Sequence, residues 1–160
     1  MQTKRGKQVV KLANLVMKQL KPFCKSGKIE IAGSIRRHSE NPGDIDIVLI
    51  PKENTKDKIK EILNKKGKFI EGGDKRVRFN IDGVNVELYY STEEEWGATL
   101  LAYSSKKGAG IGLRIVARLK GFKLSQHGLF NRKTGKRIAG KTEREIYAAL
   151  GRPYKEPENR

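Results

Sequence analysis

The first apolar pattern along the chain has the spacing of a helix. Between Lys4 and Lys21 the apolar residues, which recur every one to four positions, are Val9, Val10, Ala13, Val16, Met17 and Leu20. This spacing predicts an amphipathic helix. We expect the helix to end at Pro22, because proline lacks the amide hydrogen that a helix interior requires.

Strand-like patterns follow this helix. We predict a short strand over residues 28–32 and a second over 44–50, where Ile45, Ile47 and Leu49 alternate with Asp44 and Asp46. Helical spacing returns after Pro51, from a cap at Asn54 or Thr55 to Lys66, with the inward positions Ile59, Ile62 and Leu63.

The clearest local pattern is a hairpin. Residues 76–81 and 84–90 both alternate apolar and polar side chains, and Asp82-Gly83 lies between them. This pair suits a two-residue type I′ turn, in which both central residues have positive φ. We therefore predict two antiparallel strands with Val84, Val86 and Leu88 toward the core and Glu87 on the opposite face.

The second half of the chain is predicted to be helical at both ends. Ser91 or Thr92 can cap a helix that runs through Tyr103, and KKGAGIG (106–112) is expected to be a flexible break before a short helix over 113–120. Residues 122–140 are rich in turn formers and predict a small sheet. The TERE sequence at 142–145 is a capping box that predicts a last helix over 142–150.

The net charge of the chain predicts what kind of partner it binds. The 160 residues fit one compact domain or two small subdomains, and their net charge of +17 predicts a polyanion as partner, with nucleic acid the first candidate and an anionic membrane surface the second. No apolar run approaches the roughly 18 residues of a spanning helix, so we expect no membrane insertion. The single Cys24 and two histidines exclude a zinc knuckle, and we expect an intracellular protein, with no secretory signal at its start.

The candidate chemistry lies in three carboxylates. Asp44 and Asp46 share one face of their predicted strand, and side by side they raise each other's pKa. A pair of Mg²⁺ ions, which prefer oxygen ligands, would remove that penalty and could clamp the oxygens of a phosphoryl transfer. Glu87 can supply a third carboxylate if its strand neighbours that of the aspartates. The alternative is structural: the hairpin register puts Arg78 opposite Glu87, where an ion pair alone would explain the glutamate.

A loop with phosphate-binding character precedes the aspartates. Gly33-Ser34 offers backbone amides and a hydroxyl between a strand and a short helix, and Arg36 and Arg37 add charged donors. A basic loop that merely neutralises the aspartates is the alternative interpretation.

Three separated segments resemble family X DNA polymerases, the polymerase beta group of the nucleotidyltransferase superfamily. They are Gly33-Ser34-Ile35-Arg36-Arg37 followed by Gly43-Asp44-Ile45-Asp46, then GFKLSQHGLF (121–130), then LGRPYKEPENR (150–160). The resemblance implies an α+β chain: a nucleotidyltransferase-type palm over 1–93, with a mixed sheet and helices on one face, and a small α+β thumb over 94–160. The family usually adds a lyase domain and helix-hairpin-helix fingers; we expect neither here, because the chain resembles the very small viral family X polymerases built only of palm and thumb.

The resemblance further implies roles for individual residues. Asp44, Asp46 and Glu87 would be the catalytic, metal-binding carboxylates for two Mg²⁺ ions, with Mn²⁺ as a possible substitute. The incoming dNTP would be bound by Gly33, Ser34, Arg37, Gly43, Tyr103 and Ser104. Arg114 would contact the DNA, which would be gapped or primer–template. From the net charge we add the candidate phosphate contacts Lys106, Lys107, Arg118, Lys120 and Lys123, for each of which a solvated face is the default interpretation. His127 could contact a phosphate or a base, but it can equally be a hydrogen-bonded structural histidine.

The implied function is template-directed DNA synthesis by a monomer, with short-gap filling in repair. The sequence departs from the family where Glu87 replaces the usual aspartate and where Gly110 replaces an asparagine that often contacts the incoming base. Three alternatives stay open: a template-independent nucleotidyltransferase, an RNA-directed one, or a non-catalytic nucleic-acid binder on the same scaffold.

Overall fold

The structure is a computed structural model that describes all 160 residues. The chain forms two compact units, Met1–Ser91 and Thr92–Arg160. Both units combine helices with a sheet, so the predicted α+β class is confirmed.

The first unit is built on a five-stranded mixed sheet. Its strands are β1 (Cys24–Ile31), β2 (Ile45–Pro51), β3 (Lys68–Gly72), β4 (Arg76–Ile81) and β5 (Val84–Tyr90), in the order β1-β2-β5-β4-β3. Strands β2 and β5 are parallel, and the other neighbours are antiparallel. The β4–β5 hairpin has the predicted bounds, and its turn residues Asp82 and Gly83 have the positive φ values of a type I′ turn.

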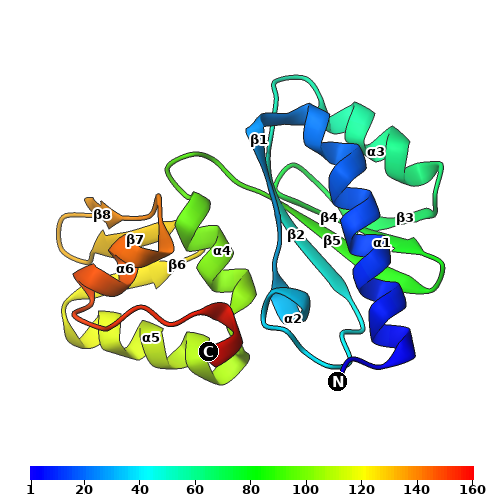
Figure 1. Cartoon of the computed structure of the whole chain (residues 1–160). Coiled ribbons are helices and arrows are strands. Elements are labelled where there is room, and N and C mark those ends of the chain that lie inside the picture. The colour runs from blue at the N-terminus through cyan, green and yellow to red at the C-terminus, as the bar shows by residue number, and fades with distance from the viewer. The chain divides into compact units, whose positions relative to one another are not determined.

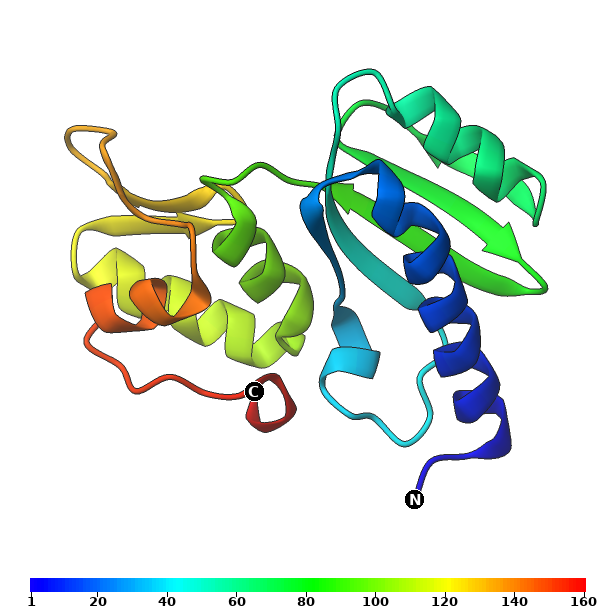
Figure 2. The ribbon, with the colours of Figure 1, turned by 45° about the horizontal axis from the view of Figure 1, so that its top comes forward.

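Two helices cover one face of this sheet (Figures 1 and 2). Helices α1 (Lys4–Leu20) and α3 (Lys56–Asn64) pack their buried positions, such as Val16 and Ile59, against the inward side chains of the strands. The predicted core residues Ile45, Ile47 and Leu49 are completely buried there. Since side chains alternate along β2, Asp46 emerges on the face opposite the helices.

The second unit packs three helices with a three-stranded antiparallel sheet. The helices are α4 (Trp96–Ser104), α5 (Lys107–Leu119) and α6 (Glu143–Ala149), and the strands are β6 (Phe122–Ser125), β7 (Gly128–Asn131) and β8 (Arg137–Ala139). The predicted small sheet and last helix are confirmed, and Thr142 caps α6 by accepting a hydrogen bond from the Glu145 amide. Short 3₁₀ turns at Lys21–Phe23 and Pro157–Asn159 and the four-residue helix α2 (Gly33–Arg36) complete the chain.

The flexible break predicted at 106–112 is wrong. Helix α5 is continuous from Lys107, and the Gly110 amide already donates to the Lys106 carbonyl at 2.9 Å. Glycines at 108, 110 and 112 lower helix propensity, but the packing of Leu113, Val116 and Ala117 in the core of the second unit outweighs that cost.

Two strand predictions also need correction. Strand β3 was not predicted, because Phe69 and Ile70 are adjacent and break the alternation; the strand is held at the sheet edge by pairing with β4 across a register shift. Strand β1 begins at Cys24 rather than residue 28, because an irregularity at Ser26 and Gly27, both with positive φ, interrupts the pattern without ending the strand.

Candidate active site

Parallel pairing of β2 and β5 brings two of the predicted carboxylates together. Asp46 and Glu87 are direct partners in the register of these strands, on the sheet face opposite the helices. Asp44 lies just before β2, is exposed, and is close enough for its charge to act on Asp46. Strands β2 and β5 are therefore neighbours, which is the arrangement that Glu87 needs in order to lie beside the aspartates.

The environment of Asp46 opposes ionisation. Burial, together with the neighbouring charges of Glu87 and Asp44, raises its pKa to about 6, against a hydrogen bond from Tyr89 and the charge of Arg37. The carboxylate is therefore costly to ionise, first because it is buried and second because two other carboxylates lie near it.

Gly33 is required beside Asp46 for two reasons. Its φ of +62° lies in the left-handed region, and a Cβ at this position would overlap with Oδ2 of Asp46. The Ala32 amide also donates to the Asp46 carbonyl at 2.7 Å. The glycine-serine turn is thus fitted directly against the aspartate, as expected of parts of one site.

Glu87 is held by the ion pair that the hairpin register predicted. Arg78, its cross-strand partner on β4, donates from Nε to Oε1 of Glu87 at 2.8 Å, and a second guanidinium nitrogen binds the same oxygen. Burial alone would raise the pKa of Glu87, but hydrogen bonds from Tyr89 and Arg78 and the charges of Arg78 and Arg76 hold it below its usual range. The glutamate therefore carries its charge at neutral pH.

Tyr89 is the residue of this site that the sequence did not single out. Its hydroxyl lies 2.7 Å from Oε2 of Glu87 and 3.1 Å from Oδ1 of Asp46. Burial, followed by the charge of Asp46, raises its pKa, so the phenol keeps its proton. The signal was its position two residues after Glu87, which puts both side chains on one face of the strand.

A divalent cation fits the chemistry of this donor set. The three carboxylates offer only oxygen ligands, and a cation would neutralise the mutual repulsion through which Glu87 and Asp44 contribute to the raised pKa of Asp46. The side chains do not already surround one point: no group of three or more acidic, histidine or cysteine residues is arranged to hold a metal ion.

The predicted nucleotide-binding residues are divided between the units. In the first unit, Ser34 and Arg37 are half-buried around α2, and Gly43 is exposed, with open space where its side chain would be. In the second unit, Tyr103 is half-buried and Ser104 is completely buried near the end of α4.

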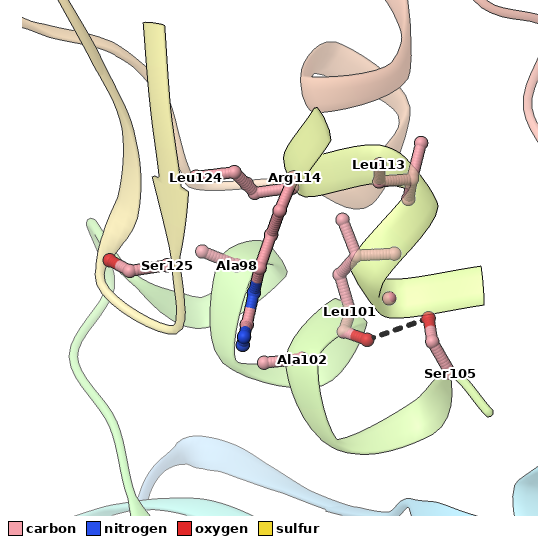
Figure 3. Close-up of a pocket in the computed structure, with 9 residues that line it drawn as sticks. Ala98, Leu101, Ala102, Ser105, Leu113, Arg114, Leu124 and Ser125 are labelled. Carbon is pink, nitrogen blue, oxygen red and sulfur yellow. Dashed lines mark hydrogen bonds between the residues drawn. The ribbon is translucent and has the colours of Figure 1, made fainter. Parts of the chain in front are cut away.

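Arg114 lines a small pocket within the second unit (Figure 3). Its side chain extends from α5 past Ala98 toward Ala102 on α4. Gly110, one turn earlier on α5, lines the same pocket, and a Cβ at this position would meet nothing within 4 Å.

The other predicted DNA contacts are exposed, with one exception. His127 is hydrogen-bonded through Nδ1 to Glu95, as expected for the structural histidine that was one of its two interpretations. The exposed cations are Lys106, Lys107, Arg118, Lys120 and Lys123, all on or near α5 and β6. No helix of the chain is both long and apolar enough to span a bilayer.

A mixed sheet with carboxylates on neighbouring parallel strands, joined to a separate α+β unit, defines the class of palm-and-thumb nucleotidyltransferase folds. The DNA polymerase beta palm matches residues 6–76, and the DNA polymerase beta thumb matches residues 99–160. Together these matches cover most of the chain, which therefore belongs to the polymerase beta family, family X.

Curated relatives agree with this assignment. The chain is 29% identical over 157 residues to the DNA polymerase/3′-5′ exonuclease PolX of Bacillus subtilis, covering 94% of this chain and 27% of PolX. It is 28% identical over 143 residues to Repair DNA polymerase X of African swine fever virus, covering 84% of this chain and 82% of the viral protein. The chain thus spans little more than a quarter of PolX and most of the viral enzyme.

A solved structure shares the fold. A crystal structure of Leishmania infantum polymerase beta, in a ternary P/T complex, matches with a TM-score of 0.80 at 20% identity, covering 96% of this chain and 75% of that chain. The likeness extends over both units and supports the fold assignment.

Proposed function

We propose that the chain is a template-directed DNA polymerase that adds a dNTP to a primer 3′-end and fills short gaps during repair. The observation that carries the proposal is the register of β2 and β5, which pairs Asp46 with Glu87 beside the Gly33-Ser34 turn. The names of the relatives, a PolX and a repair polymerase, point in the same direction.

Asp44, Asp46 and Glu87 are the residues that would hold two divalent cations, Mg²⁺ or Mn²⁺. Such ions supply charge neutralisation at the attacking and leaving oxygens of phosphoryl transfer. The chain contributes the fixed carboxylates, which are already crowded at Asp46 and already ionised at Glu87. The Glu87 carboxylate would also accept a hydrogen bond from the primer hydroxyl.

The remaining residues would position the substrates. Ser34, Arg37 and the backbone at Gly33 and Gly43 would bind the triphosphate, with Tyr103 near the sugar. Arg114 and the exposed lysines of the second unit would bind the DNA backbone and minor groove, in a protein that acts as a monomer. The net charge of +17 favours such binding before any specific contact forms.

Primer extension with and without a template tests this proposal. We expect insertion only opposite a complementary template base, with dNTPs preferred over rNTPs and with a requirement for Mg²⁺ or Mn²⁺. Equal insertion of all nucleotides without a template would instead identify a template-independent transferase, and extension on an RNA template alone an RNA-directed one. Metal-independent DNA binding without any insertion would identify a non-catalytic binder.

A further inference from the structure

We propose that Tyr89 is a positioning residue that fixes Asp46 and Glu87 relative to each other so that both can bind a divalent cation. The inference rests on the proposed function, because it concerns the carboxylates of that site. It adds a residue to which neither the family resemblance nor the sequence pattern gave a role.

The position of the hydroxyl carries the inference. Tyr89 lies on the same face of β5 as Glu87, is 8% exposed, and reaches across to the neighbouring strand, where its oxygen lies 3.1 Å from Oδ1 of Asp46. The same oxygen is 2.7 Å from Oε2 of Glu87. One group therefore contacts a carboxylate on each of two strands.

The other oxygens of both carboxylates are fixed by separate neighbours. Oε1 of Glu87 is held by Arg78, and Oδ2 of Asp46 lies against Gly33, where a side chain could not fit. Those contacts fix each carboxylate to its own surroundings. The Tyr89 hydroxyl contacts Oδ1 of one carboxylate and Oε2 of the other, and this shared contact is the basis for assigning it the positioning role.

The chemistry of a hydroxyl suits this task better than a cation would. A phenol has one proton, which it can donate to either carboxylate in turn, so it orients both without adding a positive charge. The negative charge needed for metal binding is preserved. Residues that orient ligands in this way typically account for about 10-fold to 100-fold in metal affinity or activity.

Manganese binding to the protein alone tests the inference. Electron paramagnetic resonance counts free Mn²⁺ in the absence of DNA and nucleotide, for the wild type, Tyr89→Phe and the matched control Tyr90→Phe. Tyr90 follows on the same strand, faces the helices and loses the same atom. We expect about 10-fold weaker Mn²⁺ binding in Tyr89→Phe and no change in Tyr90→Phe.

Two further measurements separate positioning from folding. The melting midpoint of each variant in EDTA reports its stability, and the rise in that midpoint on adding Mn²⁺ reports metal affinity even for a less stable variant. In extension assays, Tyr89→Phe should lower kcat and raise the Mg²⁺ requirement with little change in the dNTP KM.

Unchanged or tighter Mn²⁺ binding by Tyr89→Phe would overturn the inference. Because no DNA or nucleotide is present, this outcome is distinct from failure of the proposed polymerase activity. Wild-type protein that fails to extend a primer but shows the expected loss on Tyr89→Phe would overturn the proposed function and leave the positioning role standing.

Discussion

At the scale of single residues, Asp46 shows most directly how function opposes stability. With its pKa raised from the ordinary 3.8 to about 6, the folded chain binds a proton at pH values where the unfolded chain has released it. In the absence of a cation, stability therefore falls as the pH rises through this window, and the penalty is fully present above it.

Replacement of Asp46 by asparagine should remove this penalty. The variant keeps an oxygen acceptor for Tyr89 but loses the charge, so in EDTA at pH 8 its melting midpoint should exceed that of the wild type. Below about pH 3 the difference should vanish, because Asp46 is then protonated in the folded wild type and largely protonated in its unfolded chain. Calorimetry over this pH range measures both effects.

The exposed Asp74, in the β3–β4 turn, provides the control for that experiment. Asp74→Asn should leave the midpoint close to that of the wild type at both pH values. A lower midpoint for Asp46→Asn at pH 8 would contradict the view that the aspartate is held there at a cost in stability.

The two interpretations of Glu87 can be separated by substitutions of the pair. Glu87→Ala should lower primer extension by about 100-fold or more if the carboxylate acts in the reaction. Arg78→Ala should destabilise the fold, because it leaves a half-buried carboxylate without the guanidinium that hydrogen-bonds to it. Single-turnover kinetics and urea denaturation measure the two effects.

Glu71→Ala is the matched control, since Glu71 also pairs with Arg78 but lies at the sheet edge on β3. It should change neither extension nor, by more than about 0.5 kcal/mol, stability. Normal extension by Glu87→Ala together with a destabilised Arg78→Ala would identify Glu87 as a structural ion-pair partner.

At the scale of elements, the prediction of a flexible break at 106–112 was wrong because it rested only on the low helix propensity of the glycines in α5. A Cβ at Gly108, Gly110 or Gly112 would meet nothing within 4 Å, so none of these glycines is needed for space. Gly97 in α4 is different, since a Cβ there would overlap with the backbone of Thr142. The two helices therefore respond in opposite ways to alanine.

Gly112→Ala should stabilise the second unit by up to about 1 kcal/mol, because alanine favours the helix and the position is open. Gly97→Ala should destabilise it, because α4 and the Thr142 backbone must separate. Urea denaturation followed by circular dichroism measures both changes. Destabilisation by Gly112→Ala would show that α5 does not retain its helix in solution.

Elements with strong local patterns could be predicted from the sequence, and those set by pairing could not. The β4–β5 hairpin was predicted residue for residue from its alternation and Asp-Gly turn. Strand β3 lacks alternation, and it exists because β4 offers it a partner. The start of α5 likewise depends on packing in the core of the second unit, which cannot be read from local helix propensity.

The candidate site follows the same division. Asp44 and Asp46 could be found from their spacing, and Arg78 from the hairpin register. The approach of Glu87 to Asp46 depends on β2 and β5 being neighbours, which a crossover connection decides and no local pattern reports. The alternation along β5 places Tyr89 on the same face as Glu87, but its hydrogen bond to Asp46 depends on the pairing of β2 with β5.

At the scale of the whole molecule, the net charge of +17 is far larger than the ion pairs of the fold can compensate. Ion pairs such as those of Arg78 and Lys58 involve only a small part of the basic residues, and the cations of α5 and β6 are exposed. Such a surface predicts binding to DNA that releases counterions and weakens steeply with salt.

Affinity for gapped DNA, measured by fluorescence anisotropy against salt concentration, tests this account. The logarithm of the affinity should fall linearly with that of the salt concentration. Lys107→Ala, at the start of α5, should reduce the slope by about 1, whereas Lys58→Ala on α3, whose lysine pairs with Glu61, should not. A flat salt dependence would contradict an electrostatic interface.

The central claim is that the carboxylates at the β2–β5 pair carry out template-directed nucleotide transfer. Its most direct test is single-turnover insertion into a one-nucleotide gap by the wild type and by the variants Asp44→Ala and Asp46→Ala, with DNA affinity measured in parallel. We predict insertion of the complementary dNTP by the wild type, and no insertion by either variant despite retained DNA binding. Insertion at the wild-type rate by either variant would contradict the account.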